Sequence, residues 1–373
     1  MQYSTFAAID IGSYDVILEI FEISKKQGIR SVDKICHRME LGKDTYTLGK
    51  IRPEMEEELC RVLADFVRIM EGYRVDDYRA TASSAISEAS NSLYVLGKIH
   101  QLTGFSVTVL SNSEQRFLSY KALAAMEDNF NKIIEKGTAI LDLDGGSFQI
   151  SLFDKDALVT TQNIRMGSLR IRERLAGIQS ETEHYEEMVE ELIWNEVSSF
   201  KKMYLKDRKI ENIMLIGDVF TDSVYQNIEE KTTKIISREN FNTWYEKIIR
   251  QSPMELAVKL GIPLENASLM YPSAVIYKCL IDMMGAEHIW IPGVHMTRGI
   301  AYEYAEQMKL LKGGHNFEND ILMAAKNIGK RYAVNRPHVQ NLEMTALAMF
   351  DATKKMHGMK ERERLLLQMA VML

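Results

Sequence analysis

Cysteine is scarce in this sequence, and none of its cysteines form a close pair. Only Cys36, Cys60 and Cys279 are present, and they lie far apart in the chain. A CxxC pair would be typical of a zinc site, and an even set of regularly spaced cysteines would be typical of a disulfide framework. The sequence therefore predicts neither, and a reduced cytoplasmic location is the default expectation.

Long apolar runs are also absent. A membrane-spanning helix needs about eighteen or more consecutive apolar residues. No run reaches that length, and Asp10 and Asp15 interrupt the apolar stretch near the N-terminus. The sequence therefore predicts neither a transmembrane helix nor a signal peptide, and no membrane partner.

An excess of positive charge is the third missing feature. The formal net charge is −6, whereas a broad nucleic-acid surface requires clustered lysine and arginine. The sequence therefore argues against a nucleic-acid partner. Two local basic runs remain: one contains Lys201, Lys202, Lys206, Arg208 and Lys209, and the other contains Arg165, Arg170, Arg172 and Arg174. The first is interpreted as a solvated helix end.

The features that are present indicate a folded α/β protein of two or three units. The chain has 373 residues, of which 46% are hydrophobic and 26% charged, an ordinary composition for a soluble protein. Apolar alternation predicts strands at 4–11, 15–24 and 29–39, and helical spacing predicts a long helix over 54–73.

The segment 139–153, AILDLDGGSFQISLF, carries the most specific pattern. It predicts a strand, a tight turn containing Asp142, Asp144, Gly145, Gly146 and Ser147, and a returning strand. Adjacent glycines let backbone N–H groups approach a phosphate, and a neighbouring carboxylate can hold a metal or a water. Gly-Gly is also a common hairpin connector, so a purely structural turn stays open at this point.

A second hairpin of the same kind lies at the N-terminus. Residues 6–13, FAAIDIGS, form an apolar stretch that ends in an acid and a glycine, and another apolar stretch follows at once. Two such hairpins that face each other across a cleft are the mark of the actin, sugar-kinase and heat-shock ATPase architecture. The pattern favours a functional role for Asp10 and Asp142 over simple turn capping.

Five ordered segments resemble the exopolyphosphatase and guanosine pentaphosphate phosphohydrolase family. They are AAIDIGSYDVILEI in the first hairpin, ASSAISEASN from Ala82, LSNSEQ from Leu110, LDLDGGSFQI in the second hairpin and MGSLR from Met166. The resemblance implies two RNase H-like (actin-like ATPase) domains, 1–125 and 126–308, that face a cleft. Residues 309–373 resemble the start of an HD-type helical domain.

The family resemblance also implies a chemistry and a set of residues. The reaction is hydrolysis of a terminal phosphoanhydride of polyphosphate or a guanosine polyphosphate nucleotide, with Mg²⁺ as cofactor. The implied catalytic residues are Glu114 and Asp142, and Asp10 and Asp142 would hold the metal. Asp144 is a further catalytic candidate, although it falls on the first glycine of the family's second loop. The implied phosphate-binding residues are Gly12, Ser13, Gly145, Gly146, Ser147, Gly167 and Arg170.

Several functional positions of the family differ in this sequence. The second of two adjacent family glutamates, the usual base, falls on Gln115, and the acid that ends the second loop falls on Gln149. A phosphate-contacting arginine falls on Ser87, and a Gly-Gly-Thr segment falls on Gly217-Asp218-Val219. Glutamine cannot accept a proton at neutral pH, and serine cannot replace a bidentate arginine.

Three interpretations are therefore open. In the first, Glu114 or Asp144 serves as the base and the protein remains a hydrolase. In the second, the protein binds polyphosphate or a nucleotide as a sensor or regulator without hydrolysing it. The third is a scaffold role by analogy with actin, which rests on fold alone. For Glu114, an acid in the first turn of a helix is an equally supported interpretation.

The C-terminal segment predicts amphipathic helices from Phe317 onwards. The sequence stops before the residues that would supply the His-Asp pair of an HD-type domain, so we expect an incomplete domain. Its helices would leave an apolar face uncovered, which is compatible with a homodimer.

Overall fold

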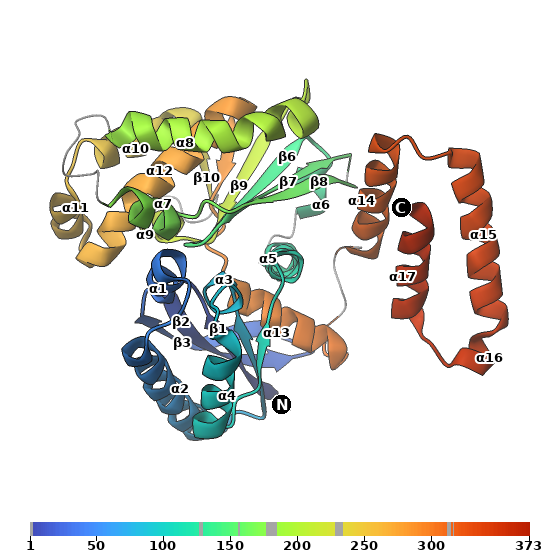
Figure 1. Cartoon of the computed structure of the whole chain (residues 1–373), viewed down its shortest axis with the longest axis horizontal. Helices are drawn as coiled ribbons and strands as arrows, with labels where there is room; N and C mark the ends of the chain where they lie inside the picture. The colour runs from blue at the N-terminus through green and yellow to red at the C-terminus, as the bar shows by residue number, and fades with distance from the viewer. Residues whose placement is uncertain are drawn as a thin grey trace.

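Two β-sheets with the same strand order form the core of the protein (Figure 1). The computed structural model describes residues 3–126, 130–155, 157–176, 185–227, 234–311, 315 and 317–373. The first sheet has the order β3-β2-β1-β4-β5, and its strands are β1 (Ser4–Ile11), β2 (Asp15–Ser24), β3 (Gly28–Arg38), β4 (Asp77–Ala82) and β5 (Val107–Val109). The second sheet repeats this order as β8-β7-β6-β9-β11 and adds β10 at its edge. Its strands are β6 (Thr138–Leu143), β7 (Phe148–Asp154), β8 (Ala157–Ile164), β9 (Asn212–Ile216), β10 (Ile235–Ser237) and β11 (His288–Trp290).

The direction of the strands is also repeated. In each sheet the first three strands are antiparallel, and the next two are parallel to the first strand. The central strands β1 and β6 are apolar along almost their whole length, because helices or the other parts of the fold cover both faces. The prediction of two RNase H-like domains is thereby confirmed.

Helices surround the two sheets. Those in the first part of the chain are α1 (Leu41–Leu48), α2 (Pro53–Tyr73), α3 (Ser84–Ser87), α4 (Ser92–Thr103) and α5 (Asn112–Met126). The next helices along the chain are α6 (Phe130–Ile134), α7 (Ser168–Leu175), α8 (Tyr185–Phe200), α9 (Val219–Asn227), α10 (Arg238–Ile249), α11 (Pro253–Leu260), α12 (Leu264–Met284) and α13 (Met296–Gln307). A single π-helical turn, η1 (Lys201–Leu205), extends α8.

Helix α13 packs on the first sheet, although it follows the second sheet in sequence. It contacts β1, β2 and α5, and the ring of Tyr304 stacks on Phe6 with centroids 4.1 Å apart. Helix α13 therefore packs with the first unit, although the sequence suggested that the second domain extends to residue 308. This crossing places the start of α13 between the two sheets.

Four helices form the C-terminal unit, namely α14 (Phe317–Arg331), α15 (Arg336–Ala352), α16 (Lys354–His357) and α17 (Glu361–Met372). Helix α14 packs on β8, where the Asn327 side chain donates to the carbonyl oxygens of Leu158 and Val159. Helices α15 and α17 lie outside α14 (Figure 1). An apolar cavity of about 950 Å³ separates α5 from α14 and α17. Among the described residues, no helix has the length and apolar character needed to cross a membrane.

Candidate functional site

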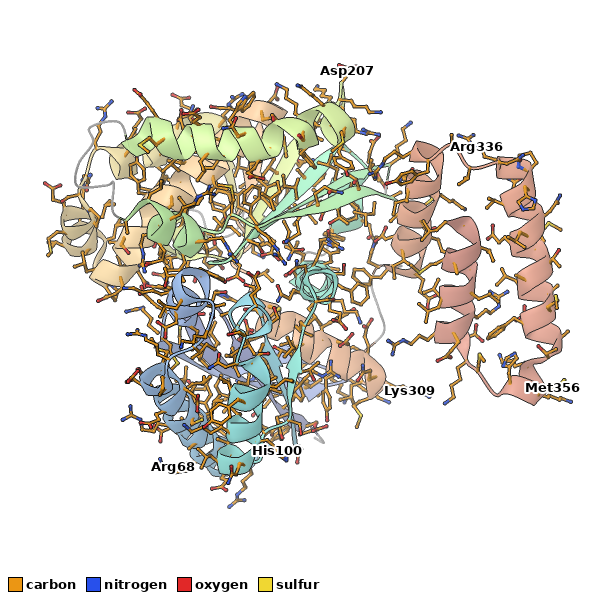
Figure 2. The ribbon with its side chains drawn as sticks, in the orientation of Figure 1. Arg68, His100, Asp207, Lys309, Arg336 and Met356 are labelled. Atoms are coloured by element: carbon orange, nitrogen blue, oxygen red, sulfur yellow. The ribbon has the colours of Figure 1, made fainter. Side chains whose placement is uncertain are left out.

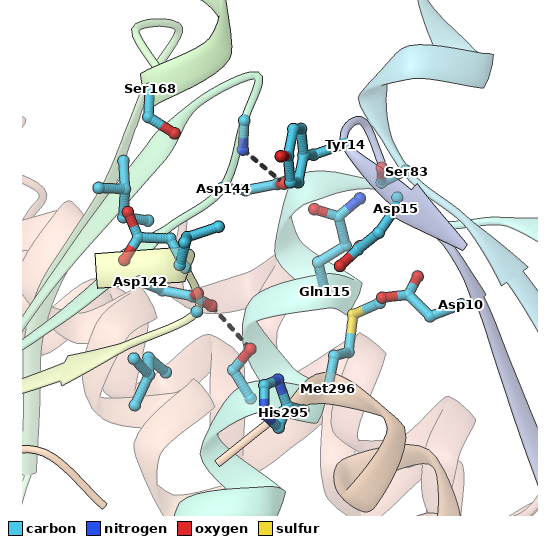
Figure 3. A pocket seen from close by; sticks show the side chains of 18 of the residues that line it. Asp10, Tyr14, Asp15, Ser83, Gln115, Asp142, Asp144, Ser168, His295 and Met296 are labelled. Carbon is cyan, nitrogen blue, oxygen red and sulfur yellow. Dashed lines mark hydrogen bonds between the residues drawn. The ribbon is translucent and has the colours of Figure 1, made fainter. Parts of the chain in front are cut away.

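A cavity of about 130 Å³ lies where the two sheets face each other (Figure 3). Asp10 lies one residue before the end of β1, and Asp142 has the same position on β6. Because α/β sheets bind ligands beyond the carboxyl ends of their strands, the two equivalent strand ends bring both acids to one space. Both line this cavity, as the duplicated hairpins predicted.

Aspartates supply most of the ionisable side chains that line this cavity, which we call the acidic cavity. Six aspartates line it: Asp10, Asp15, Asp142, Asp144, Asp218 and Asp222. No lysine or arginine of the described residues does so. The imidazole of His295 lies at the start of α13, with Nε2 3.4 Å from Asp222 Oδ1. A phosphate compound can therefore enter only if cations or protons offset this charge.

Asp142 and Asp144 combine burial with specific hydrogen bonds. Ser119 on α5 donates its hydroxyl to Asp142 Oδ2 at 2.7 Å, and the Gly145 N–H donates to Asp144 Oδ1 at 2.6 Å. Burial nevertheless dominates, and it raises the pKa of Asp142 to about 6 and that of Asp144 to about 7. Asp144 therefore changes its protonation state near neutral pH, which suits a general base.

Asp10 has a carboxylate oxygen without a partner. Its Oδ1 atom is buried and makes no hydrogen bond within the described part of the chain. Burial, followed by the charges of Asp15, Asp144 and Asp142, raises the pKa of Asp10 well above its ordinary value. A buried unpartnered oxygen is costly, and a bound cation would satisfy it. The neighbouring Asp15 accepts a hydrogen bond from the Cys36 thiol at 3.2 Å.

Asp218 is a site residue that the sequence analysis treated only as a departure from the family. It follows the end of β9, the strand beside β6, and so reaches the same cavity. Its Oδ1 accepts from the Thr221 N–H at 3.1 Å and from the Tyr277 hydroxyl at 3.4 Å. Burial raises its pKa to about 7. A buried strand followed by Gly-Asp was the available signal, because the other two acids also lie at strand ends.

The two glycine turns are packed closely against each other. Gly12 and Gly145 line the acidic cavity, but the Gly12 N–H already donates to the Asp15 carbonyl at 2.9 Å. Behind them, the Ser13 hydroxyl bonds that of Tyr46 at 2.6 Å, and Tyr46 bonds Ser84 at 2.8 Å. Gly146 lies on this side, because a Cβ there would overlap the Tyr46 hydroxyl, and Ser147 is buried outside the cavity lining. Only Gly12 and Gly145 of the predicted phosphate-binding residues therefore line the cavity.

Arg170 and Gly167 hold the second turn in place and do not line the cavity. The Arg170 Nε donates to the Gly146 carbonyl at 2.8 Å, and its guanidinium pairs with Glu88 at 3.0 Å. The same guanidinium lies over the Tyr46 ring, 3.8 Å from its centroid. Because these contacts occupy the guanidinium, the structure shows Arg170 as a link between the two units.

Glu114 lies outside the acidic cavity, contrary to the role that the resemblance implied. It is exposed in the first turn of α5, where its Oε2 accepts from the N–H and the hydroxyl of Ser111, both at 2.8 Å. These bonds lower its pKa, as expected for a capping acid. It faces the apolar cavity beside α17 instead. The catalytic assignment of Glu114 is therefore not supported by its position.

Gln115 and Gln149 do line the acidic cavity. Gln149 lies directly opposite Asp142 in the β6–β7 pair, and Gln115 projects from α5 between the acids of the two units (Figure 3). The Gln115 Nε2 and Gln149 Oε1 atoms are buried without a hydrogen-bond partner in the described residues. The two amides thus occupy the space expected for carboxylates.

The donor set fits one mode of metal binding. In the part of the chain that the structure describes, no three histidine, cysteine or acidic side chains converge as a dedicated metal cage. Mg²⁺ does not require such a cage, because it is usually held by one or two carboxylates, water and substrate phosphates. Asp10, with its unpartnered oxygen, and Asp142 across the cavity satisfy that requirement.

Comparisons with known proteins identify related sequences. The model of the Ppx/GppA phosphatase family matches residues 19–308. A bifunctional 3-dehydroquinate synthase/phosphatase of Fusobacterium nucleatum is 21% identical over 310 residues, which are 76% of this chain and 44% of that protein. Exopolyphosphatase 1 of Mycobacterium leprae is 25% identical over 144 residues, which are 38% of this chain and 41% of that protein. The matches thus span less than half the length of either curated relative.

Solved structures share the fold. An exopolyphosphatase from Cytophaga hutchinsonii superimposes with a TM-score of 0.72 and 17% identity, over 82% of this chain and 98% of that chain. A Ppx/GppA family member of Aquifex aeolicus gives a TM-score of 0.67 and 17% identity, over 82% and 99%. These similarities show a two-domain actin-like fold. Since the family model covers most of the sequence and both acid-bearing strand ends meet at one cavity, this chain belongs to the Ppx/GppA phosphatase family.

Proposed function

We propose that this protein hydrolyses the terminal phosphoanhydride bond of polyphosphate or guanosine pentaphosphate in a reaction that depends on Mg²⁺. Family membership supports phosphatase chemistry. The observation that carries the proposal is the pair of equivalent strand-end acids, Asp10 and Asp142, which face one cavity together with Asp144. Buried carboxylates with raised pKa values in a cavity are typical of functional sites.

Asp144 is the proposed general base. Its pKa of about 7 leaves a large fraction of the carboxylate ionised at neutral pH, while keeping it basic enough to accept a proton. A water molecule attacks the terminal phosphorus atom, Asp144 accepts the proton of that water, and the bond to the bridging oxygen breaks. The bridging oxygen leaves on the shortened chain as a phosphate oxyanion.

Asp10 and Asp142 are the proposed metal ligands. When bound, Mg²⁺ would neutralise the phosphoryl oxygens and so allow a polyanion into an acidic space. Ser119 orients Asp142 through its 2.7 Å hydrogen bond. Gly12 and Gly145 place backbone without side chains at the cavity wall, where a phosphoryl group can approach closely.

A second candidate function is binding of the same ligands without hydrolysis. It is favoured by Gln115 and Gln149, which occupy positions that are acidic in the family pattern. It is also favoured by the absence of lysine and arginine from the described cavity lining. A sensor of this kind would bind a metal–phosphate complex and release it unchanged.

Phosphate release from polyphosphate and from guanosine pentaphosphate, measured with and without Mg²⁺, distinguishes the two functions. We expect Asp142→Asn to reduce the rate by roughly 10²-fold or more, because it weakens a metal ligand. Glu114→Gln, a matched change outside the acidic cavity, should leave the rate within about twofold of wild type. Mg²⁺ should also raise the thermal unfolding midpoint of wild type more than that of Asp142→Asn.

Two results would decide against hydrolysis. If wild type binds both compounds with Mg²⁺ but releases no phosphate, the binding function is correct. If Glu114→Gln abolishes release while Asp142→Asn does not, the acidic cavity is not the active site.

A further inference from the structure

A second pocket, of about 260 Å³, lies beside β8 between the π-helical turn and α14, and it shares no lining residue with the acidic cavity. Its floor consists of β8 and Asn327, which is fixed by hydrogen bonds to the β8 backbone. Its walls carry four cationic side chains, namely Lys206, Arg208, Lys330 and Arg331. We call this site the basic pocket.

The basic pocket carries an excess of positive charge in the part of the chain that the structure describes. None of its four cations forms an ion pair with a carboxylate among the residues that the structure describes. The only nearby acid on the same turn, Asp207, lies at the outer tip of the molecule (Figure 2) and does not line the pocket. Four like charges around one small space are mutually repulsive, so an anion would stabilise them.

Two of the cations are held in place by Tyr204. The Arg208 guanidinium donates to the Tyr204 carbonyl at 2.6 Å, and that of Arg331 donates to the Tyr204 hydroxyl at 2.9 Å. The Arg331 guanidinium also lies over the Tyr204 ring, 4.6 Å from its centroid. Fixed guanidinium groups lose little freedom on binding, which favours bidentate contacts with phosphate.

The backbone of the wall is irregular at the same point. Helix α8 widens into the π-helical turn Lys201–Leu205, closed by a hydrogen bond from the Lys206 N–H to the Lys201 carbonyl at 2.8 Å. Lys206 itself has φ of 51°, which is strained for a residue with a side chain. Single π-turns and such strained residues are frequent at functional sites. Here Lys206, which follows the turn, lines the same pocket as residues of α14.

From these observations we infer that the basic pocket is a second anion site, which binds a soluble oligophosphate independently of the acidic cavity. Four cations suit a ligand with three or more negative charges. The site needs no metal, because its own side chains supply the positive charge. The acidic cavity, in contrast, repels a metal-free polyanion, so the two sites differ in their dependence on Mg²⁺.

A compact oligophosphate fits this site better than a nucleic acid or a membrane surface. The pocket is small, at about 260 Å³, whereas nucleic-acid backbones and lipid surfaces require an extended basic face. The whole chain carries a net charge of −6. This net charge argues against an extended basic face for nucleic acid on the rest of the molecule.

Calorimetric titration with inorganic tripolyphosphate in EDTA tests the inference. Chelation of divalent metals leaves only the basic pocket able to bind, so we expect one site per chain. Lys206→Glu combined with Lys330→Glu should weaken binding by at least roughly tenfold, and the corresponding pair of glutamine substitutions should weaken it less. Because EDTA excludes the proposed metal-dependent reaction, failure here and failure of the hydrolase proposal are distinguishable.

The control reverses two charges beside the pocket but outside its lining. Lys201→Glu combined with Lys202→Glu changes the net charge equally, and at about 0.15 M salt it should alter the affinity less than about twofold. Thermal unfolding midpoints verify that each variant is folded. The inference is overturned if wild type does not bind tripolyphosphate in EDTA, or if both pairs of substitutions weaken binding equally. It is also overturned if the pocket variants lose binding only to single-stranded RNA or to anionic vesicles.

Discussion

At the scale of single residues, the acidic cavity contains carboxyl groups whose ionisation is unfavourable in the folded protein. Burial raises the pKa values of Asp10, Asp142, Asp144 and Asp218 together. Carboxylates with raised pKa values destabilise the folded state as pH increases, because the unfolded chain ionises at lower pH. The protein retains them nonetheless, which is consistent with a site that is completed by a cation.

The pH dependence of hydrolysis should report the ionisation of Asp144. A base must be unprotonated, so the rate is low while Asp144 is protonated and rises to a plateau as it ionises. Burial raises the pKa of Asp144 to about 7 without metal, and Mg²⁺ held by Asp142 would offset one of the charges that raise it, so the limb should lie at or below about pH 7. We expect kcat/KM for polyphosphate, measured with Mg²⁺ from about pH 5 to about pH 9, to show this acid limb. Asp144→Asn should lower the plateau by on the order of 10²–10⁴-fold.

The variant Gln115→Glu tests the same assignment of Asp144 by adding a carboxylate to the cavity. If Asp144 is the base, a new carboxylate at position 115 should raise the rate by less than about tenfold, because the proton already has an acceptor. A larger gain in Gln115→Glu would contradict the assignment of Asp144 and favour the impaired binding protein. An unchanged rate in Asp144→Asn would show that another group serves as the base.

The site was predictable from the sequence only where a motif marks a strand end. Asp10, Asp142 and Asp144 lie in the two duplicated hairpins, and all three reach the cavity. The position of Glu114 could not be deduced, because a one-residue shift on a helix turns the side chain by about 100°. Ser111 captures it as a cap, and its neighbour Gln115 faces the acids instead.

At the scale of elements, one glycine determines how closely the second turn approaches α7. A Cβ at Gly167, the residue before α7, would overlap the backbone of Asp144 and Gly145. Gly167→Ala should therefore displace the turn, lower the stability by about 1–3 kcal/mol and reduce hydrolysis. Thermal unfolding and phosphate release measure the two effects.

A glycine in a different element serves as the control. Gly97 lies in α4, and a Cβ there would meet nothing within 4 Å. Gly97→Ala should stabilise the protein by about 0.5–1 kcal/mol and leave hydrolysis unchanged. If Gly167→Ala behaves like this control, the close packing between the second turn and α7 is needed neither for stability nor for hydrolysis.

The elements themselves were largely predictable, because period-2 and period-3.6 patterns are local. Strands β1 and β2 match the expected ranges, and α2 matches the helix expected over 54–73. The packing of α13 on the first sheet was not predictable, since the sequence order places it after the second sheet. The expected homodimer and cytoplasmic location stay predictions, because they concern surroundings that a single chain does not show.

At the scale of the whole molecule, charged side chains of α7 join the two sheet-bearing units outside the lining of the acidic cavity. The Arg170 guanidinium pairs with Glu88 at 3.0 Å, and that of Arg172 pairs with Glu40 at 2.8 Å. Both acids belong to the first unit, whereas α7 belongs to the second. These contacts hold the cavity walls at their present separation.

Loss of the Arg170–Glu88 pair should loosen this closed arrangement. We expect Arg170→Ala to raise KM for polyphosphate more than it lowers kcat, because Arg170 positions the second turn and does not line the cavity. A double-mutant cycle with Glu88→Ala, measured by unfolding, should give a coupling of about 1 kcal/mol. The cycle for Arg68 and Asp65, an exposed pair within α2, should give less than about 0.5 kcal/mol. Equal couplings in the two cycles would show that the Arg170–Glu88 pair does not hold the units together. An effect of Arg170→Ala confined to kcat would show that Arg170 acts on the reaction itself.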